Sequence, residues 1–164
     1  MITGQIGLIP HGGTFIPEAI AWITKSPVSH TIVAISETEC LGAEPLGARI
    51  RPINDFPNAI WSHFELTNTQ RADIVNWTYD HEGTPYSYLD DAAIGIALLS
   101  HIPTPAFVRH YLDNTGHYEC AQLADLAYQA AGIHLFDDGR VPGAVFPGSY
   151  EPIWKTNGWW PNTV

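Results

Sequence analysis

The feature that most limits the fold is a series of strand-like segments separated by short turns. The first contains the β-branched run Thr31-Ile32-Val33, which favours a central strand, and a polar turn to the second predicts a hairpin. Pro52 indicates that the third lies at an edge, because proline cannot donate to a strand ladder. With an opening strand, the series predicts a small antiparallel sheet made of residues 4–10, 28–35, 40–44, 48–53 and 60–66.

Helix-like segments mostly follow this series instead of alternating with it. After Gly132 the chain shows no strong periodicity, which predicts a loop-rich closing segment that its aromatic side chains pack back onto the domain. This order is typical of an α+β domain with helices packed on the sheet, and one domain covering residues 1–164 is expected. The predicted helices are residues 15–24, 67–82, 89–100 and 118–131, with a helical turn at 107–112.

Composition excludes some classes of function. The 164 residues carry a formal net charge of −10 with only 7 Lys and Arg, which argues against nucleic acid and against anionic membrane surfaces as partners. No apolar run reaches the ~20 residues of a membrane span, and the N-terminus has no secretory signal pattern. The protein is therefore expected in the cytoplasm as synthesised, with export or association with a virion left open.

The cysteines and histidines do not follow a metal-ligand pattern. Cys40 and Cys120 are the two cysteines, and neither a C-x-x-C motif nor a Cys/His zinc spacing is present. The eight histidines are scattered along the chain. No metal and no other cofactor is expected. Cys40 has no helix terminus beside it and is interpreted as structural.

Cys120 falls in the first turn of the helix predicted at 118–131. Leu123, Leu126, Ala127 and Ala130 recur at helical spacing, and Gly132 provides a left-handed stop. The unpaired N–H groups of a helix N-terminus lower the pKa of a nearby thiol and can stabilise an oxyanion. A cysteine there is still more often a packed core residue unless a base lies beside it.

His30 and Glu44 are the candidates for that base and for the group that orients it. His30 opens the central strand, where an imidazole can point into a cleft, and Glu44 ends the neighbouring strand. Paired strands lie ~5 Å apart, so a carboxylate on one can reach an imidazole on the other. Taken singly, His30 is also explained as a strand-end histidine and Glu44 as a solvated hairpin residue. Glu37 and Glu39 compete with Glu44 but lie in the polar turn.

Six stretches, in order, resemble the circularly permuted branch of the NlpC/P60 superfamily of papain-like thiol hydrolases. The first three resemble its opening strand, its histidine strand and its glutamate strand pair; the others resemble its helix with a G-x-P-Y turn, its cysteine helix and its closing turn. They cover nearly the whole chain, and they read GQIGLIP, ITKSPVSHTIVAI, LGAEPLGARIRPI, TNTQRADIVNWTYDHEGTPYSYLD, YECAQLADLAYQAAGI and VPGAV.

The resemblance implies a permuted papain-like fold and assigns roles to individual residues. It makes Cys120 the nucleophile, His30 the general base and Glu44 the orienting carboxylate. Tyr86 matches the tyrosine that helps line the oxyanion site, and Tyr118 competes for that role. Two positions depart from the family pattern, because Ala121 stands where Ser or Gly is usual and Ala144 where Asp is common. These departures leave the substrate class open.

The function expected from the residues and the resemblance is that of a cysteine amidase or peptidase working through a thioester acyl-enzyme. The resemblance implies a peptide or amide substrate, with cell-wall peptides of peptidoglycan as the default, and a phage-encoded accessory hydrolase would fit. One alternative is a lipid acyltransferase or acyl-ester hydrolase of the same fold, with the apolar segment 92–99 and the Trp-rich tail lining a lipid groove. Another is a binding module without catalysis, against which a complete Cys/His/Glu set argues. The sequence does not define the oligomeric state.

Overall fold

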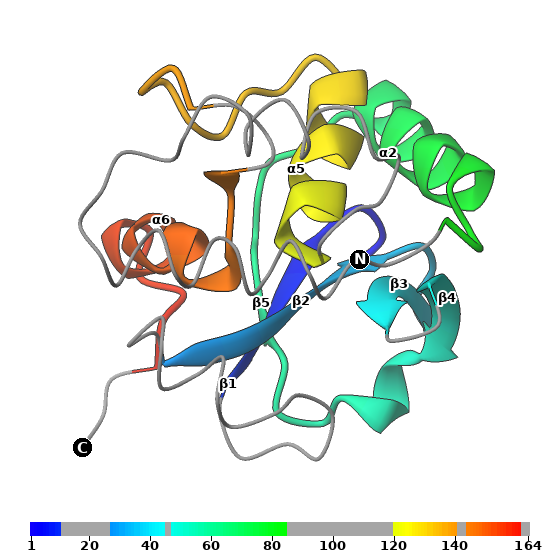
Figure 1. Cartoon of the computed structure of the whole chain (residues 1–164), viewed down its shortest axis with the longest axis horizontal. Coiled ribbons are helices and arrows are strands. Elements are labelled where there is room, and N and C mark those ends of the chain that lie inside the picture. Colours follow the sequence, from blue (N-terminus) through cyan, green and yellow to red (C-terminus); the bar gives the residue numbers. More distant parts are fainter. Residues whose placement is uncertain (11–26, 45–46, 85–119, 141–143, 162–164) are drawn as a thin grey trace, which may run out of the picture.

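A computed structural model describes residues 1–10, 27–44, 47–84, 120–140 and 144–161, with the side chain of Glu44 outside this set. Within these ranges the chain is α+β, with a five-stranded sheet, three α-helices and two 3₁₀ turns (Figure 1). None of the helices described there combines the length and apolar character needed to cross a bilayer. The helices predicted at 15–24 and 89–100 and the turn at 107–112 lie outside the described residues. The strands are β1 (Ile6–Pro10), β2 (Val28–Ala34), β3 (Glu39–Glu44), β4 (Gly47–Pro52) and β5 (Ile60–Trp61), and the helices are α2 (Asn68–Asp80), α5 (Cys120–Ala130) and α6 (Glu151–Thr156), with 3₁₀ turns η1 (Ile53–Asp55) and η3 (Pro147–Tyr150).

The sheet is antiparallel throughout, with the strand order β4-β3-β2-β1-β5. The central position predicted for the Thr31-Ile32-Val33 strand is confirmed, and so is the edge position of the strand that ends at Pro52. The predicted hairpin is also confirmed, since Ile32 pairs with Gly42 and Ala34 with Cys40. The β-branched run therefore forms the middle of the sheet, as local propensity favours.

The strand predicted at 60–66 is wrong beyond Trp61. Ile60 and Trp61 pair with β1 and the Ser62 N–H still donates to the Ile6 carbonyl at 2.8 Å, but beyond Ser62 the Gln5 side chain replaces the ladder. The Gln5 Oε1 atom accepts hydrogen bonds from the Ser62 hydroxyl at 2.6 Å and the Phe64 N–H at 2.9 Å, and its Nε2 donates to the Phe64 carbonyl at 2.9 Å. A buried amide side chain thus satisfies backbone groups that a longer strand would pair.

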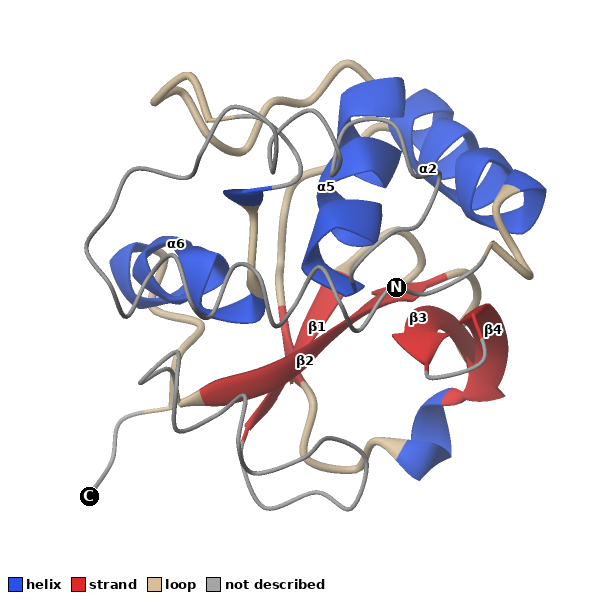
Figure 2. Cartoon of the chain, viewed as in Figure 1, coloured by secondary structure: helices blue, strands red, loops and turns tan. Residues whose placement is uncertain are grey.

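The two faces of the sheet have different coverings. Paired residues in an antiparallel ladder point to the same face, and neighbours along a strand alternate. One face, hereafter the helix face, packs against α2, α5 and α6 (Figure 2). The other, hereafter the far face, packs against Phe56, from the segment after η1. The helix face carries Ile6, Leu8, Val33 and Leu41, and the far face carries Ile9, Ile32 and Cys40.

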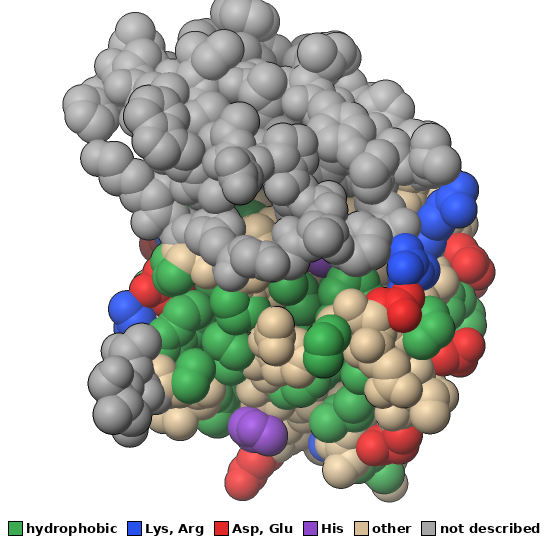
Figure 3. Space-filling model, turned by 90° about the horizontal axis from the view of Figure 1, so that it is seen from below, with side chains coloured by type: hydrophobic (Ala, Val, Ile, Leu, Met, Phe, Trp, Pro, Cys, Tyr) green, Lys and Arg blue, Asp and Glu red, His purple; other side chains and the backbone are tan. Residues whose placement is uncertain are grey.

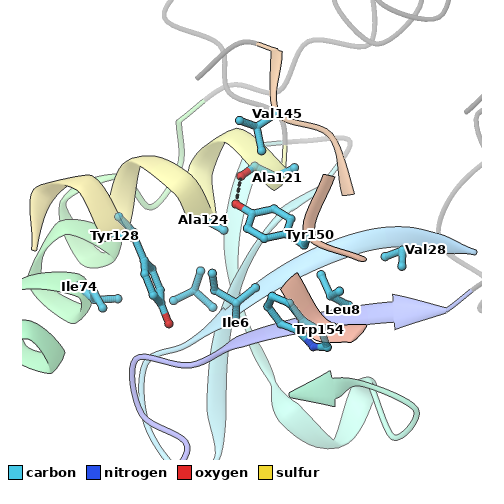
Figure 4. Packing of buried hydrophobic residues seen from close by; sticks show 12 residues of the cluster. Ile6, Leu8, Val28, Ile74, Ala121, Ala124, Tyr128, Val145, Tyr150 and Trp154 are labelled. Carbon is cyan, nitrogen blue, oxygen red and sulfur yellow. Dashed lines mark hydrogen bonds between the residues drawn. The ribbon is translucent and has the colours of Figure 1, made fainter. Parts of the chain in front are cut away.

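One hydrophobic cluster, hereafter the main core, joins β1 and β2 to α2, α5 and α6. Its buried aromatic side chains are Tyr128, Tyr150 and Trp154 (Figure 4). Tyr128 donates from its hydroxyl to the Gly4 carbonyl at 2.7 Å, and Tyr150 donates to the Ala121 carbonyl at 2.8 Å. The Trp154 indole N–H donates to the Ile60 carbonyl at 2.9 Å. Each ring therefore buries a large apolar area without leaving its polar atom unpaired.

The loop-rich closing segment predicted after Gly132 is wrong for residues 147–156. That stretch forms η3 and α6, which are too short to show a helical period in the sequence. Proline at the first turn and the Glu151–Lys155 ion pair at 2.5 Å support α6 locally, and Trp154 fixes it to the core. The expected packing of Trp154, Trp159 and Trp160 onto the domain is confirmed.

Figure 3 shows the surface of the molecule from below. Apolar and uncharged side chains cover most of its described part, and acidic side chains lie toward the margins.

Trp154→Ala should lower the free energy of unfolding by about 3–5 kcal/mol, because it leaves a cavity in the main core and removes the donor to Ile60. Urea denaturation followed by circular dichroism would measure the change. The matched control is Trp160→Ala, at a partly exposed ring, which should cost clearly less. Equal losses in the two variants would contradict the assignment of Trp154 as the anchor of α6.

Candidate functional site

The candidate nucleophile lies at the start of a helix packed on the sheet. Cys120 is the first residue of α5, and its side chain is 4% exposed. The helix ends as predicted at Gly132, whose φ is +72°. The Ile133 N–H bonds to the Tyr128 carbonyl and the Gly132 N–H to the Gln129 carbonyl, both at 2.9 Å, which is a Schellman cap. The first N–H groups of a helix have no intrahelical partners and favour a nearby thiolate, whereas burial among apolar side chains opposes its formation.

The buried side of α5 is shifted from the predicted stripe. Leu123 and Ala127 are buried as expected, but Leu126 is partly exposed and Ala130 is exposed. Tyr128 takes their place in the core because its hydroxyl reaches Gly4. This rotation turns Cys120 toward the sheet.

Small side chains of β3 and β4 surround the Cys120 thiol. It lies in one apolar cluster with Ala43 and Ala48, and the other buried members of the cluster are Ile35, Leu41 and Leu123. Apart from Ile35, which directly follows β2, these residues belong to the helix face of the sheet or to α5 itself. The backbone of Ala48 also pairs with the end of the α2 loop, donating to the Thr84 carbonyl at 2.8 Å and accepting from the Gly83 N–H at 2.7 Å.

His30 lies near the start of β2 and is 5% exposed. The register of β1 with β2 shifts beside it, since Ile9 pairs with His30 and Pro10 with Val28, so Ser29 is an extra residue. The imidazole lies 6.1 Å, centroid to centroid, from the Phe56 ring. Its Nδ1 atom is buried and has no hydrogen-bond partner among the described residues. An open Nδ1 is the atom that an orienting carboxylate would bind.

Burial lowers the pKa of His30 from 6.5 to about 4. The cause is desolvation, which disfavours the imidazolium form. His30 is therefore neutral at pH 7 and able to accept a proton. A general base works best with a pKa near the operating pH, so the imidazole is a weak base while it stays in this buried position.

The structure brings Cys120 and His30 to the same end of the sheet but to different faces. His30 pairs with Ile9 and approaches Gly42, both on the far face, whereas Cys120 packs with Ala43 on the helix face. Within the described residues, the pairing of β2 with β3 ends at Ile32 and Gly42, although β3 continues to Glu44. The backbone of β3 at residues 42 and 43 therefore separates the imidazole from the thiol.

Glu44 ends β3 and pairs with Gly47 of β4. Continuing the register of Ile32 with Gly42 by two residues brings position 44 opposite His30, as the predicted role of Glu44 requires. The side chain of Glu44 is outside the described set, so its role stays a prediction. Tyr86 and Tyr118, the two candidates for the oxyanion site, also lie outside the described residues.

Cys40 lies on the far face within β3 and is fully buried. Its thiol donates to the Arg51 carbonyl at 3.5 Å. Its position inside β3 agrees with the interpretation of Cys40 as a structural residue. Within the described residues, no group of three His, Cys, Asp or Glu side chains is placed to hold a metal ion.

Three features near α5 and His30 were not predicted. Asp125 is buried on α5, where its Oδ2 accepts from the Gln129 amide at 2.8 Å, and burial raises its pKa. Tyr150 reaches back to the first turn of α5, and Gly42 leaves space for His30. The sequence contains no signal for the Tyr150 contact, but a glycine between apolar strand residues is a known sign of close approach.

The chain was compared with models of protein families and with curated proteins, and neither comparison found a match. The expected relation to the NlpC/P60 superfamily therefore depends on the quoted motifs.

Protein stability should depend on pH through His30. Between pH 6.5 and about 4 the unfolded chain binds a proton at this position and the folded chain does not, so stability is lost as the pH falls through this range. The full effect is about 3 kcal/mol. Urea denaturation at a series of pH values should show a shallower slope for His30→Gln than for the wild type.

The exposed His63 supplies a variant that also removes one imidazole, and equal changes of slope in His63→Gln and His30→Gln would show that the effect is not specific to His30. Asp125 contributes with the opposite sign, because its raised pKa means that stability is lost as the pH rises through its titration. The comparison of variants cancels this contribution. A slope that is identical in His30→Gln and the wild type would contradict a buried neutral His30.

Proposed function

We propose that the protein is a cysteine-dependent amidase or peptidase of the permuted papain-like type. The observation that carries the proposal is a thiol at the first residue of α5, which packs on the same sheet that carries, on its other face, a buried neutral histidine with an open Nδ1. A nucleophile, a base and a group that orients the base are the parts that such a reaction needs. In this proposal they are Cys120, His30 and Glu44.

The reaction would proceed in two halves. The Cys120 thiol gives its proton to His30, and the sulfur forms a bond with the amide carbonyl carbon while the carbonyl electron pair moves to oxygen. Backbone N–H groups at the start of α5 would stabilise that oxyanion. The C–N bond then breaks, and the amine leaves with the proton from His30. Water next gives a proton to His30, attacks the thioester carbon and releases the acid, and the proton returns to the sulfur.

The proposal requires the imidazole to reach the helix face. The place for this is the end of the β2–β3 pairing, where His30 lies beyond the last pair, Ile32 with Gly42. Because the Cα–Cβ bond of a strand residue points to one face of the sheet, the ring reaches the other face only through a change of the backbone, and the extra residue Ser29 beside His30 is where the strand departs from regular pairing. Substrate entering beside Cys120 would supply the polar partner that draws the ring across.

The substrate class follows from charge and from the motifs. A net charge of −10 favours uncharged or cationic peptides over polyanions. The motif resemblance implies amide bonds of cell-wall peptides, in particular those that involve D-γ-glutamyl residues. The lipid alternative depends on the segment 92–99, which lies outside the described residues, and on the Trp-rich tail, whose tryptophans pack onto the core.

Cys120→Ala should lower the cleavage of a short peptide with a D-γ-glutamyl amide bond by at least about a thousandfold, because it removes the nucleophile. Liquid chromatography would measure the cleavage. Mass spectrometry of the quenched wild-type reaction should find an acyl group on the peptide that contains Cys120. The matched control is Cys40→Ala, which also removes a buried thiol and should keep the activity.

Other outcomes would decide between the alternatives. Release of fatty acyl groups from ester lipids, without peptide cleavage, would replace the amidase with the acyltransferase alternative. Equal loss of activity in the Cys40 and Cys120 variants would show that stability, and not the nucleophile, had changed. The absence of any thiol-dependent turnover would contradict the proposal.

A further inference from the structure

Gly42 leaves a space that the His30 imidazole occupies. A Cβ atom built on Gly42 would lie 2.9 Å from His30 Nε2 and 3.6 Å from its Cε1 atom. It would also lie 3.1 Å from Cγ2 of Ile32. Contacts under 3.0 Å are essentially never made by real Cβ atoms, so any side chain at position 42 would force the ring to move.

The backbone conformation at position 42 does not require a glycine. Gly42 has no positive φ, so its conformation is open to alanine. It lies in the middle of β3, where glycine weakens a strand and provides no side chain to pack. The close approach of His30 therefore explains why a glycine is suited to this position.

Three uncharged residues of the described set face the imidazole, and the carboxylate of Glu44, whose side chain lies outside that set, is its predicted charged neighbour. Strand β1 presents Ile9, strand β3 presents Gly42, and the segment after η1 presents Phe56. None of these side chains titrates, and burial is the cause of the lowered pKa of His30. The position of the ring, and with it the depth of burial, is thus sensitive to what stands at position 42.

We propose that Gly42 is a positioning residue for His30, and that the space above its Cα atom holds the imidazole at the end of the β2–β3 pairing. This inference rests on the proposed role of His30 as the base. A ring displaced from this space would start the reaction from a different position, and a misplacement of about 1 Å can cost a hundredfold in rate. Gly42 touches no reacting atom itself.

The sheet offers a closely matched control. Gly7 lies on the same face, and a Cβ there would meet Cγ1 of Ile32 at 2.9 Å and the Trp61 ring at 3.1 Å. Its backbone also has no positive φ. Gly7→Ala and Gly42→Ala therefore create similar crowding at the same face, and only the second crowds His30.

The test compares these two variants by the NMR titration of His30, assigned with His30→Gln, and by the pH profile of peptide cleavage. Gly42→Ala should raise the pKa of His30 toward 6.5, because a displaced ring is less buried, and should lower kcat/KM by about tenfold or more. The same variant should move the acidic limb of the pH profile. Gly7→Ala should leave the His30 titration and the position of that limb unchanged.

The readouts separate a failure of this inference from a failure of the proposed function. An unchanged His30 titration in Gly42→Ala, or equal shifts in both variants, would overturn the positioning role whatever the activity. A shifted titration in a protein that cleaves no substrate would uphold the role of Gly42 in holding the ring and refute the hydrolase. If Gly42→Ala does not fold, the wild type still decides, because a nuclear Overhauser effect between the Gly42 α-protons and the His30 ring is expected and its absence would overturn the inference.

Discussion

The packing of α5 against the sheet is the interaction on which the rest of the structure depends. The helix contributes Ala121, Ala124, Ala127 and Tyr128 to the main core, and its alanines allow close approach to the strands. The same contact fixes the first residue of α5, and therefore the Cys120 thiol, beside β3. Tyr150 then ties η3 to the first turn through the Ala121 carbonyl, so the closing segment depends on α5 as well.

The candidate site is built where the regular pairing of the sheet changes. On one side of β2, the pairing with β1 shifts register beside His30. On the other side, the pairing with β3 ends at Ile32 and Gly42 within the described residues. Irregular strand ends are common next to active sites because they re-aim side chains. The buried Nδ1 of His30 has no hydrogen-bond partner among the described residues, which costs stability, so its presence calls for an explanation. The proposed reaction gives such an explanation, because the imidazole transfers a proton to and from Cys120.

Much of the fold was predictable because local patterns agree with tertiary packing. The β-branched strand, the proline at the sheet edge, the Thr67 cap of α2 and the glycine stop of α5 all follow from residue chemistry that acts within a few positions. The strand after Trp61 and helix α6 were missed because distant contacts decide them: Gln5 ends the strand, and Trp154 anchors the helix. The sequence placed His30 near the start of the central strand and Cys120 in the first turn of a helix, as the structure does. No sequence pattern indicates that the ring of His30 and the thiol of Cys120 start on opposite faces.

The proposed function requires Cys120 and His30 to act as one catalytic pair. A crystal structure with Cys120 acylated by a peptide-derived inhibitor would test this pairing. In that structure the imidazole should have crossed the end of the β2–β3 pairing, with a ring nitrogen within ~4 Å of the sulfur. An imidazole still over Gly42, with the β3 backbone between the ring and the acylated sulfur, would contradict it.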